Sequence, residues 1–412
     1  MKAILVLTIF TLASFSVVIA DNTNNCVTCH QEWEEEDGPS YKFSRDIHAQ
    51  KGLGCVDCHG GDPSLEDMDE VREVKDYREP PDHSEVPLFC ARCHSDAEYM
   101  RAHNPSLPID QLSKYRTSVH GQLLFNEGDD KVANCISCHT VHEIGDGRLP
   151  HSSTHPKNLP ETCGHCHADA DYMAEYNIPT SQLDDYRESV HGKALLERND
   201  LGAPACNDCH SNHGAAPPEV SSLAAVCGVC HAVEAQLFAV SPHAEAYAEN
   251  DFPMCETCHS NHKILKPSDA MIGSEEPALC AECHSRDDGT TALATADSVL
   301  ASIQNLLQAH NRAAQVLNDA RTKGMMTTDE EFLMKEVDQA LIQTRTLVHA
   351  FNLDSVGPRS SEGISKADSV HLLSAQLIDE YFFRRYGLGI ATLIIAFLAL
   401  MLYRKIRTIE KG

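Results

Sequence analysis

The chain has 412 residues, with 61 Asp and Glu against 33 Lys and Arg, which gives a formal net charge of −28 at pH 7. Such an acidic excess argues against nucleic acid and other polyanions as partners, and favours soluble partners that present basic patches. A single Trp, together with 22 Gly and 19 Pro, argues against an ordinary aliphatic and aromatic core in the loop-rich parts of the chain.

Residues 1–20, MKAILVLTIFTLASFSVVIA, combine one basic residue with an apolar run and small residues near its end. This pattern predicts a secretory signal peptide cleaved before Asp21, with an uncleaved anchor as the alternative. In either case we expect the residues that follow to be delivered outside the cytoplasm.

All 18 cysteines lie in nine C-x-x-C pairs, and a histidine directly follows every pair. Zinc sites and disulfide frameworks also use paired cysteines, but neither requires that histidine. C-x-x-C-H is the attachment sequence of haem c, in which two thiols bond the porphyrin and the histidine ligates iron. We therefore predict nine covalently attached haem c groups. The attaching residues are Cys26, Cys29, Cys55, Cys58, Cys90, Cys93, Cys135, Cys138, Cys163, Cys166, Cys206, Cys209, Cys227, Cys230, Cys255, Cys258, Cys280 and Cys283, and the proximal ligands are His30, His59, His94, His139, His167, His210, His231, His259 and His284.

A two-haem unit repeats along this region. LSKYRTSVHG (112–121) and LDDYRESVHG (183–192) are 71 residues apart, as are Cys135 and Cys206. Each unit runs C-x-x-C-H, a spacer with a histidine, then C-x-x-C-H-x-x-H; the first copy has Asp62 in place of the trailing histidine. We expect a nine-haem domain over residues 21–290 that is mainly α-helical with long loops. Packed haems would form its core and supply most of its apolar burial.

Each iron can take a second axial ligand from elsewhere in the chain. A histidine three residues after a proximal one lies too close to reach across its own haem, so we expect it to ligate the next haem along. We predict that most irons are bis-histidine, with an ordinary surface or core histidine as the alternative at each position. The candidate distal ligands are His48, His83, His120, His142, His155, His191, His213, His243 and His262, and the spare candidates are His310 and His349.

After His284 the cysteines stop, and small or apolar residues recur at steps of three and four. This spacing predicts a helical hairpin and stalk over residues 291–385. We expect a break at 324–328, a second helix to about Phe351, and a third from about Ile364 that runs into a membrane span. The first seam is Ala296, Val299, Ile303, Leu306, His310, Ala313, Leu317 and Ala320.

Residues 386–403, YGLGIATLIIAFLALMLY, carry no charge and would span about 27 Å as a helix. We predict a transmembrane helix here, with a buried helix of a soluble core as the alternative. Four basic residues follow it, so the positive-inside rule places the tail, 404–412, in the cytoplasm. We expect a single-pass protein of the inner membrane, with the haem domain in the periplasm or outside the cell.

The repeats that end in SVHG and C-x-x-C-H-x-x-H resemble the periplasmic multihaem cytochromes c, the group that holds the class III tetrahaem and doubled-motif cytochromes. The resemblance covers residues 26–284. The C-terminal part, with its hairpin, RRYGLG junction and single span, looks like the tail of membrane-anchored members of that group from anaerobically respiring bacteria. Anchored quinol dehydrogenases of this kind carry an N-terminal anchor and four or five haems, and the chain departs from them on both counts.

We expect an electron carrier rather than an enzyme: a membrane-tethered haem wire of anaerobic respiration between a quinone-linked membrane subunit and periplasmic redox proteins. Filled axial sites bind no substrate, and paired imidazoles give lower potentials than Met/His pairs. The alternative is a multihaem oxidoreductase that acts on nitrite, hydroxylamine or tetrathionate at a haem with an open axial site. For that reaction, the divergent first unit and the unpaired ninth haem are the expected places.

Overall fold

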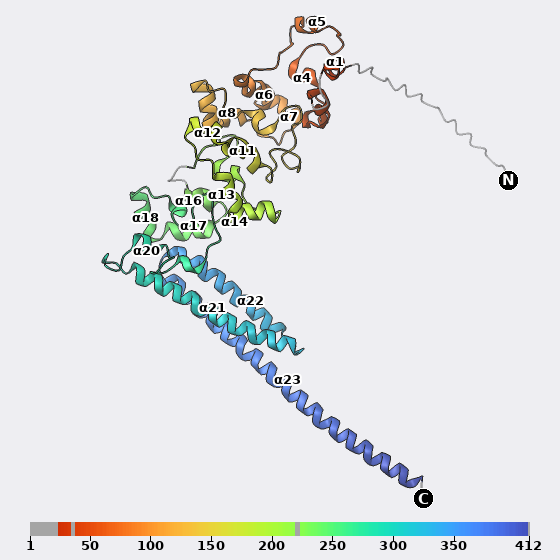
Figure 1. The fold of residues 1–412 in the computed structure, drawn as a ribbon, viewed down its shortest axis with the longest axis vertical. Coiled ribbons are helices and arrows are strands. Elements are labelled where there is room, and N and C mark those ends of the chain that lie inside the picture. Colours follow the sequence, from red (N-terminus) through yellow and green to blue (C-terminus); the bar gives the residue numbers. More distant parts are fainter. Residues whose placement is uncertain (1–23, 34–37, 219–222, 411–412) are drawn as a thin grey trace, which may run out of the picture. The chain divides into compact units, whose positions relative to one another are not determined.

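The computed structural model describes residues 24–33, 38–218 and 223–410, so the predicted signal peptide lies outside the described residues. Figure 1 shows a chain of helices, and the described residues contain no strand, which confirms the mainly α-helical fold. Contacts divide the chain into two compact units. Residues up to 180 together with 204–216 form unit 1, and residues 181–203 with those from 217 onward form unit 2.

Unit 1 is built from short helices joined by long loops. Its largest cluster of buried apolar side chains is Tyr115, Leu124 and Val132. Such a core is too small to hold a unit of this length, which agrees with haems as the missing apolar material. The helices are α1 (Asn25–Trp33), α2 (Pro39–Lys42), α3 (Ile47–Gln50), α4 (Cys55–His59), α5 (Met68–Glu73), α6 (Val86–His94), α7 (Ala97–His103), α8 (Gln111–Thr117), α9 (Val119–Gln122), α10 (Cys135–His139), α11 (Leu159–His167), α12 (Ala170–Met173) and α15 (Cys206–His210).

Unit 2 joins three further motifs to the stalk. Its short helices are α13 (Gln182–Glu188), α14 (Val190–Gly192), α16 (Leu223–Gly228), α17 (Ala232–Ala239), α18 (Pro242–Glu249), α19 (Met254–His259) and α20 (Cys280–Cys283). Three long helices follow: α21 (Ala292–Thr322), α22 (Thr328–Thr346) and α23 (Leu353–Ile409). The Arg345 guanidinium near the end of α22 forms an ion pair with Asp269 at 2.8 Å, which fixes the stalk to the loop before α20.

The stalk is a three-helix bundle in which the expected hairpin is present. The predicted break is confirmed, because α21 ends at Thr322, Gly324 has a φ of +80° and α22 begins at Thr328. The third helix begins at Leu353 rather than near Ile364, since the Asn352 side chain accepts a hydrogen bond from the Ser355 N–H and caps it. Its first part packs on both other helices. The shared core includes Val299, Ile303, Leu306, Ala313, Leu317, Met334, Val337, Ala340, Val356, Ala367 and Val370.

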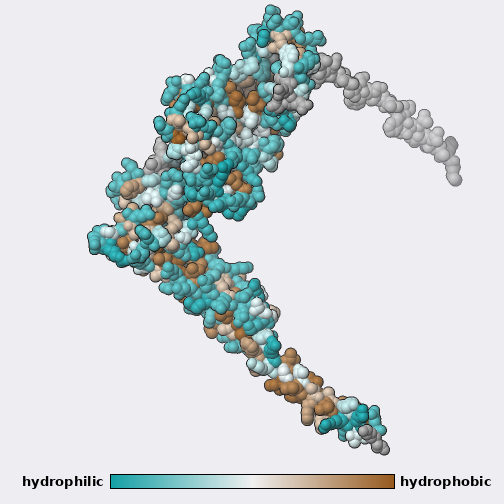
Figure 2. Space-filling view, viewed as in Figure 1, coloured by the Kyte–Doolittle hydropathy of each residue, from teal (hydrophilic) through white to brown (hydrophobic). Residues whose placement is uncertain are grey.

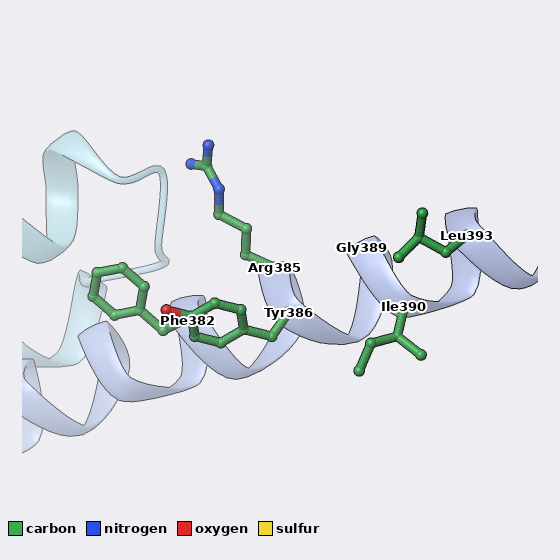
Figure 3. Close-up of a pocket in the computed structure, with 6 residues that line it drawn as sticks. All are labelled: Phe382, Arg385, Tyr386, Gly389, Ile390 and Leu393. Carbon is green, nitrogen blue, oxygen red and sulfur yellow. The ribbon is translucent and has the colours of Figure 1, made fainter.

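Helix α23 continues without interruption from the bundle through the apolar segment to Ile409. Among the described residues it is the one helix long and apolar enough to cross a membrane, with a mean hydropathy of 2.1 in its most apolar window, which is exposed. Figure 2 shows this window as a brown band near the C-terminal end. Figure 3 shows Phe382, Arg385 and Tyr386 projecting from α23 just before Ile390 and Leu393, where an interfacial belt is expected.

Candidate haem-binding sites

The nine C-x-x-C-H motifs are numbered here 1 to 9 in chain order, from Cys26–His30 to Cys280–His284. Two imidazoles that hold one iron from opposite faces of a porphyrin would have their ring centroids about 6.2 Å apart. Each nitrogen lies about 2 Å from the metal and about 1.1 Å from its own ring centroid. The two ring planes are free to rotate about the common axis. A pair of histidine rings near this spacing therefore fits a haem iron.

Four proximal histidines of unit 1 have a second histidine ring at this spacing. Burial lowers the pKa of His139 to about 4 and also lowers the pKa of His94, His120 and His167, which favours the neutral form that binds metal. The pairs and their centroid distances are His59 with His142, 6.2 Å; His94 with His48, 5.9 Å; His139 with His213, 6.0 Å; and His167 with His120, 6.0 Å.

Three proximal histidines of unit 2 are paired in the same way. Burial lowers the pKa of His191, His243 and His259. The pairs are His231 with His191, 6.3 Å; His259 with His349, 6.2 Å; and His284 with His243, 6.0 Å. His349 lies in the 3₁₀ turn Leu347–Ala350 that ends the second stalk helix, so the stalk itself supplies a ring to motif 8.

The pairs follow a fixed order along the chain. A histidine from an SVH-type segment faces an odd-numbered motif further along, as His120 faces motif 5. A histidine that trails a motif faces the even-numbered motif two places earlier, as His213, after motif 6, faces motif 4. We had expected the trailing histidine to reach the next haem along, whereas the ring that it faces belongs to the preceding repeat.

A short backbone contact, which we call the joint, holds the two kinds of histidine together. The residue before the SVH-type histidine donates its N–H to the carbonyl of the residue two places after the trailing histidine. The bonds are Ile47 to Ile144 at 2.8 Å, Val119 to Ala215 at 3.1 Å and Val190 to Ile264 at 2.8 Å. In the last repeat a ring contact takes the place of the backbone bond: Phe351, two places after His349, packs on the His243 ring with centroids 4.1 Å apart. Each joint thus fixes one histidine of each kind.

The backbone after the even-numbered motifs explains how the trailing histidine leaves its own haem. Helices α4, α10, α15 and α19 end at the proximal histidine, and the next residue has a positive φ. Beyond motifs 3 and 5, by contrast, Ser95 and Ala168 keep a φ of −108° and −100°. The sharp turn sends the chain away from the helix face that carries the proximal histidine. The turning residues are Gly60, Thr140, Ser211 and Ser260, with φ of 67°, 65°, 64° and 64°.

Three predicted distal candidates have other partners. His83 Nε2 lies 2.8 Å from the Val132 carbonyl oxygen, and His155, only 5% exposed, accepts the Lys157 N–H at Nδ1. His310 Nε2 lies 2.8 Å from an Asp338 carboxylate oxygen, which ties α21 to α22. Among the ring contacts of the described residues, none of the three faces a proximal histidine. His262 lies at a joint beside His191, and its role as a ligand stays a prediction.

Cysteines of consecutive motifs also meet. The Cys90 thiol is hydrogen-bonded to Cys135, which raises the pKa of Cys90 and lowers that of Cys135. The same contact joins Cys163 to Cys206 within unit 1, and Cys227 to Cys255 within unit 2. Since these sulfurs carry the porphyrins in a c-type cytochrome, the attachment edges of motifs 3 and 4, 5 and 6, and 7 and 8 adjoin.

Three family models of haem proteins match parts of the chain. The family model of cytochrome c3 matches residues 47–168, that of the doubled CXXCH motif matches residues 245–289, and that of cytochrome c554 and c-prime matches residues 13–60. No curated protein and no solved structure matches the chain significantly. With paired histidines at haem spacing beside motifs that three haem-protein families recognise, the chain is a multihaem c-type cytochrome, a protein that transfers electrons through covalently bound haems.

Proposed function

We propose that this cytochrome is a membrane-tethered wire of nine haem c groups, which passes electrons between a quinone-linked membrane subunit and periplasmic redox proteins in anaerobic respiration. The observation that carries the proposal is the alternation of two kinds of contact between consecutive motifs. One is the joint, where two histidines held together serve neighbouring motifs. The other is the cysteine contact, where two attachment edges meet.

In unit 1 these contacts form a continuous series from haem 2 to haem 6. The joint of His142 and His48 connects haems 2 and 3, and Cys90 with Cys135 connects haems 3 and 4. A second joint connects haems 4 and 5, and the contact between motifs 5 and 6 follows. In unit 2 haems 7, 8 and 9 are connected in the same alternating way. Short steps between cofactors are what rapid electron transfer requires.

The paired rings also favour a carrier over an enzyme. Seven of the proximal histidines have a second histidine ring at haem spacing, and an iron with both axial positions filled has no place for a substrate. The formal net charge of −28 favours partners with a basic docking face.

The length of the stalk bears on how electrons would pass between this chain and the proposed membrane partner. His349, the stalk histidine that faces motif 8, lies just before Leu353, where α23 begins. From Leu353 to Tyr386 the helix runs 33 residues, about 50 Å at 1.5 Å per residue. A quinol inside the bilayer is too distant to reduce haem 8 directly. We therefore infer that the membrane partner carries a redox domain outside the bilayer.

The test uses the purified full-length protein in lipid vesicles. We expect nine haems per chain by mass spectrometry, low-spin iron throughout the oxidised protein by electron paramagnetic resonance (EPR), and little reduction of the haems by vesicle-bound quinol alone. A high-spin fraction with turnover of nitrite or hydroxylamine would instead establish the oxidoreductase. A haem count other than nine would contradict the premise of both.

A further inference from the structure

A buried carboxylate supports one distal histidine and has no counterpart at the same place in the other repeats. Asp46 is 1% exposed, and its Oδ1 lies 2.8 Å from Nδ1 of His48 and accepts the His48 backbone N–H at 2.8 Å. Its Oδ2 accepts the Ile144 N–H at 2.7 Å. Both oxygens are thus fixed, and the His48 ring can donate its Nδ1 proton to a carboxylate while Nε2 is left for iron.

The other repeats place serine at this position, two residues before the histidine: Ser118, Ser189 and Ser241. The Ser118 hydroxyl donates to the Tyr115 carbonyl at 2.6 Å and accepts the Gly121 N–H at 2.9 Å. Ser189 makes the matching bonds to Tyr186 and Gly192. These two hydroxyls cap their own helices, so the repeats provide an internal comparison in which the backbone is preserved and the carboxylate is absent.

A carboxylate that accepts the outer N–H of a metal-bound imidazole makes that imidazole a stronger donor. A stronger donor stabilises the oxidised iron more than the reduced iron, and so lowers the reduction potential. We propose that Asp46 tunes the haem of motif 3, through His48, to a lower reduction potential than the haems of motifs 5 and 7, whose distal histidines follow serine.

The tuning has a consequence for the wire, and this consequence rests on the proposed function. Haem 3 follows haem 2 at the first joint and precedes haem 4 at the Cys90–Cys135 contact. A low potential there creates an uphill step for electrons moving in either direction. Asp46 would therefore limit rapid electron transfer through haem 3 to donors with a sufficiently low reduction potential.

The experiment is an EPR-monitored redox titration of the full-length wild type, Asp46→Asn and Asp46→Ser. Asn preserves shape and removes charge, while Ser reproduces the residue that the other repeats tolerate. Asp69→Asn removes the same charge from a side chain that is 92% exposed and serves as the control. The ring planes of His48 and His94 are 77° apart, and among the seven pairs only those of His243 and His284, at 80°, are similarly close to perpendicular. The EPR signals of these two haems, which we call the perpendicular-type signals, therefore differ from those of the other five.

We expect one of the two perpendicular-type signals to titrate at a more positive potential in both Asp46 variants. The potentials of the other haems, and all potentials in the control variant, should be unchanged. Unchanged potentials, an equal shift of all haems, or loss of the low-spin signal in both variants would overturn the proposal, the last because Asp46 would then hold the ligand rather than tune it. The wild-type titration separately counts low-spin haems. The number of low-spin haems in the wild type tests the proposed wire, and the shift in the Asp46 variants tests the role of Asp46, so the failure of one proposal is distinguished from the failure of the other.

Discussion

The imidazole rings of His139 and His213 face one another with centroids 6.0 Å apart and planes 16° apart, although they come from different repeats. We predict that His213→Ala opens the iron of the haem attached to Cys135 and Cys138. The haem beside His213 in the sequence, on Cys206 and Cys209, should keep both its attachment and its ligands. Mass spectrometry should still count every haem, while EPR should show one new high-spin iron.

His165→Ala is the matched control, because His165 is an exposed histidine in a variable position inside motif 5. It should leave every iron low-spin. A structure of the His213 variant with carbon monoxide bound would locate the open iron. Carbon monoxide at motif 6 instead of motif 4 would contradict the pairing.

The stalk histidine gives a second prediction. His349 faces His259 at 6.2 Å, and its Nδ1 lies 2.9 Å from the Thr346 carbonyl oxygen, which orients the ring. His349→Ala should make the haem of motif 8 high-spin and reactive toward carbon monoxide, while the bundle stays folded by circular dichroism. His371→Ala, at an exposed position of α23, should change neither property. Low-spin iron throughout the His349 variant would refute the assignment.

The turn after the even-numbered motifs predicts opposite effects at two positions. Ser211 is exposed and has a φ of 64° with extended ψ, a region that costs a non-glycine residue about 1–3 kcal/mol. Ser211→Gly should therefore raise the free energy of unfolding by about 1 kcal/mol, or a few degrees in Tm.

Gly60 occupies the same place after motif 2, but a Cβ there would lie 1.8 Å from the Asp76 carbonyl oxygen. Gly60→Ala should lower Tm and weaken low-spin ligation at motif 2. Thermal melts followed in the Soret band measure both variants. Equal melting temperatures for Gly60→Ala and the wild type would show that the loop containing Asp76 yields without cost.

Helix packing in the stalk gives a fourth prediction. A Cβ on Gly363 of α23 would lie 2.7 Å from Leu306 Cδ1 and 2.8 Å from Ala340 Cβ, so both neighbouring helices approach here. Gly363→Ala should destabilise the bundle by about 1–3 kcal/mol through overpacking. Gly357→Ala on the same helix, whose nearest neighbour would be 3.9 Å away, should stabilise it by up to about 1 kcal/mol. Urea unfolding followed by far-ultraviolet circular dichroism distinguishes the two.

Local patterns predicted much of this molecule. The helical fold, the break at Gly324 and the core seam through Val299, Ile303 and Leu306 all followed from residue spacing. The seam shifts by one residue at His310, because Ala309 is buried there and the His310 ring turns toward Asp338. Short-range rules suffice where a helix packs along its own length.

Ligand pairing is a long-range property, and it escaped sequence reasoning in part. His349 shares no repeat with the other trailing histidines, since motif 9 stands alone and the stalk supplies the ring instead. His83 occupies a place that matches His155, but its ring bonds the Val132 carbonyl. The sequence alone does not distinguish such a histidine from one that faces an iron.

The joints determine how the number of repeats in a protein of this kind can change. Each internal repeat provides one histidine to a motif behind it and one to a motif ahead, so a two-haem segment cut from the chain would carry its own attachment cysteines but lack both outside ligands. A duplicated repeat inserted between two existing ones gives and receives one of each, and leaves every iron served. Lengthening by whole repeats is therefore neutral for coordination, whereas removal of a single motif leaves the one histidine that faced it without an iron.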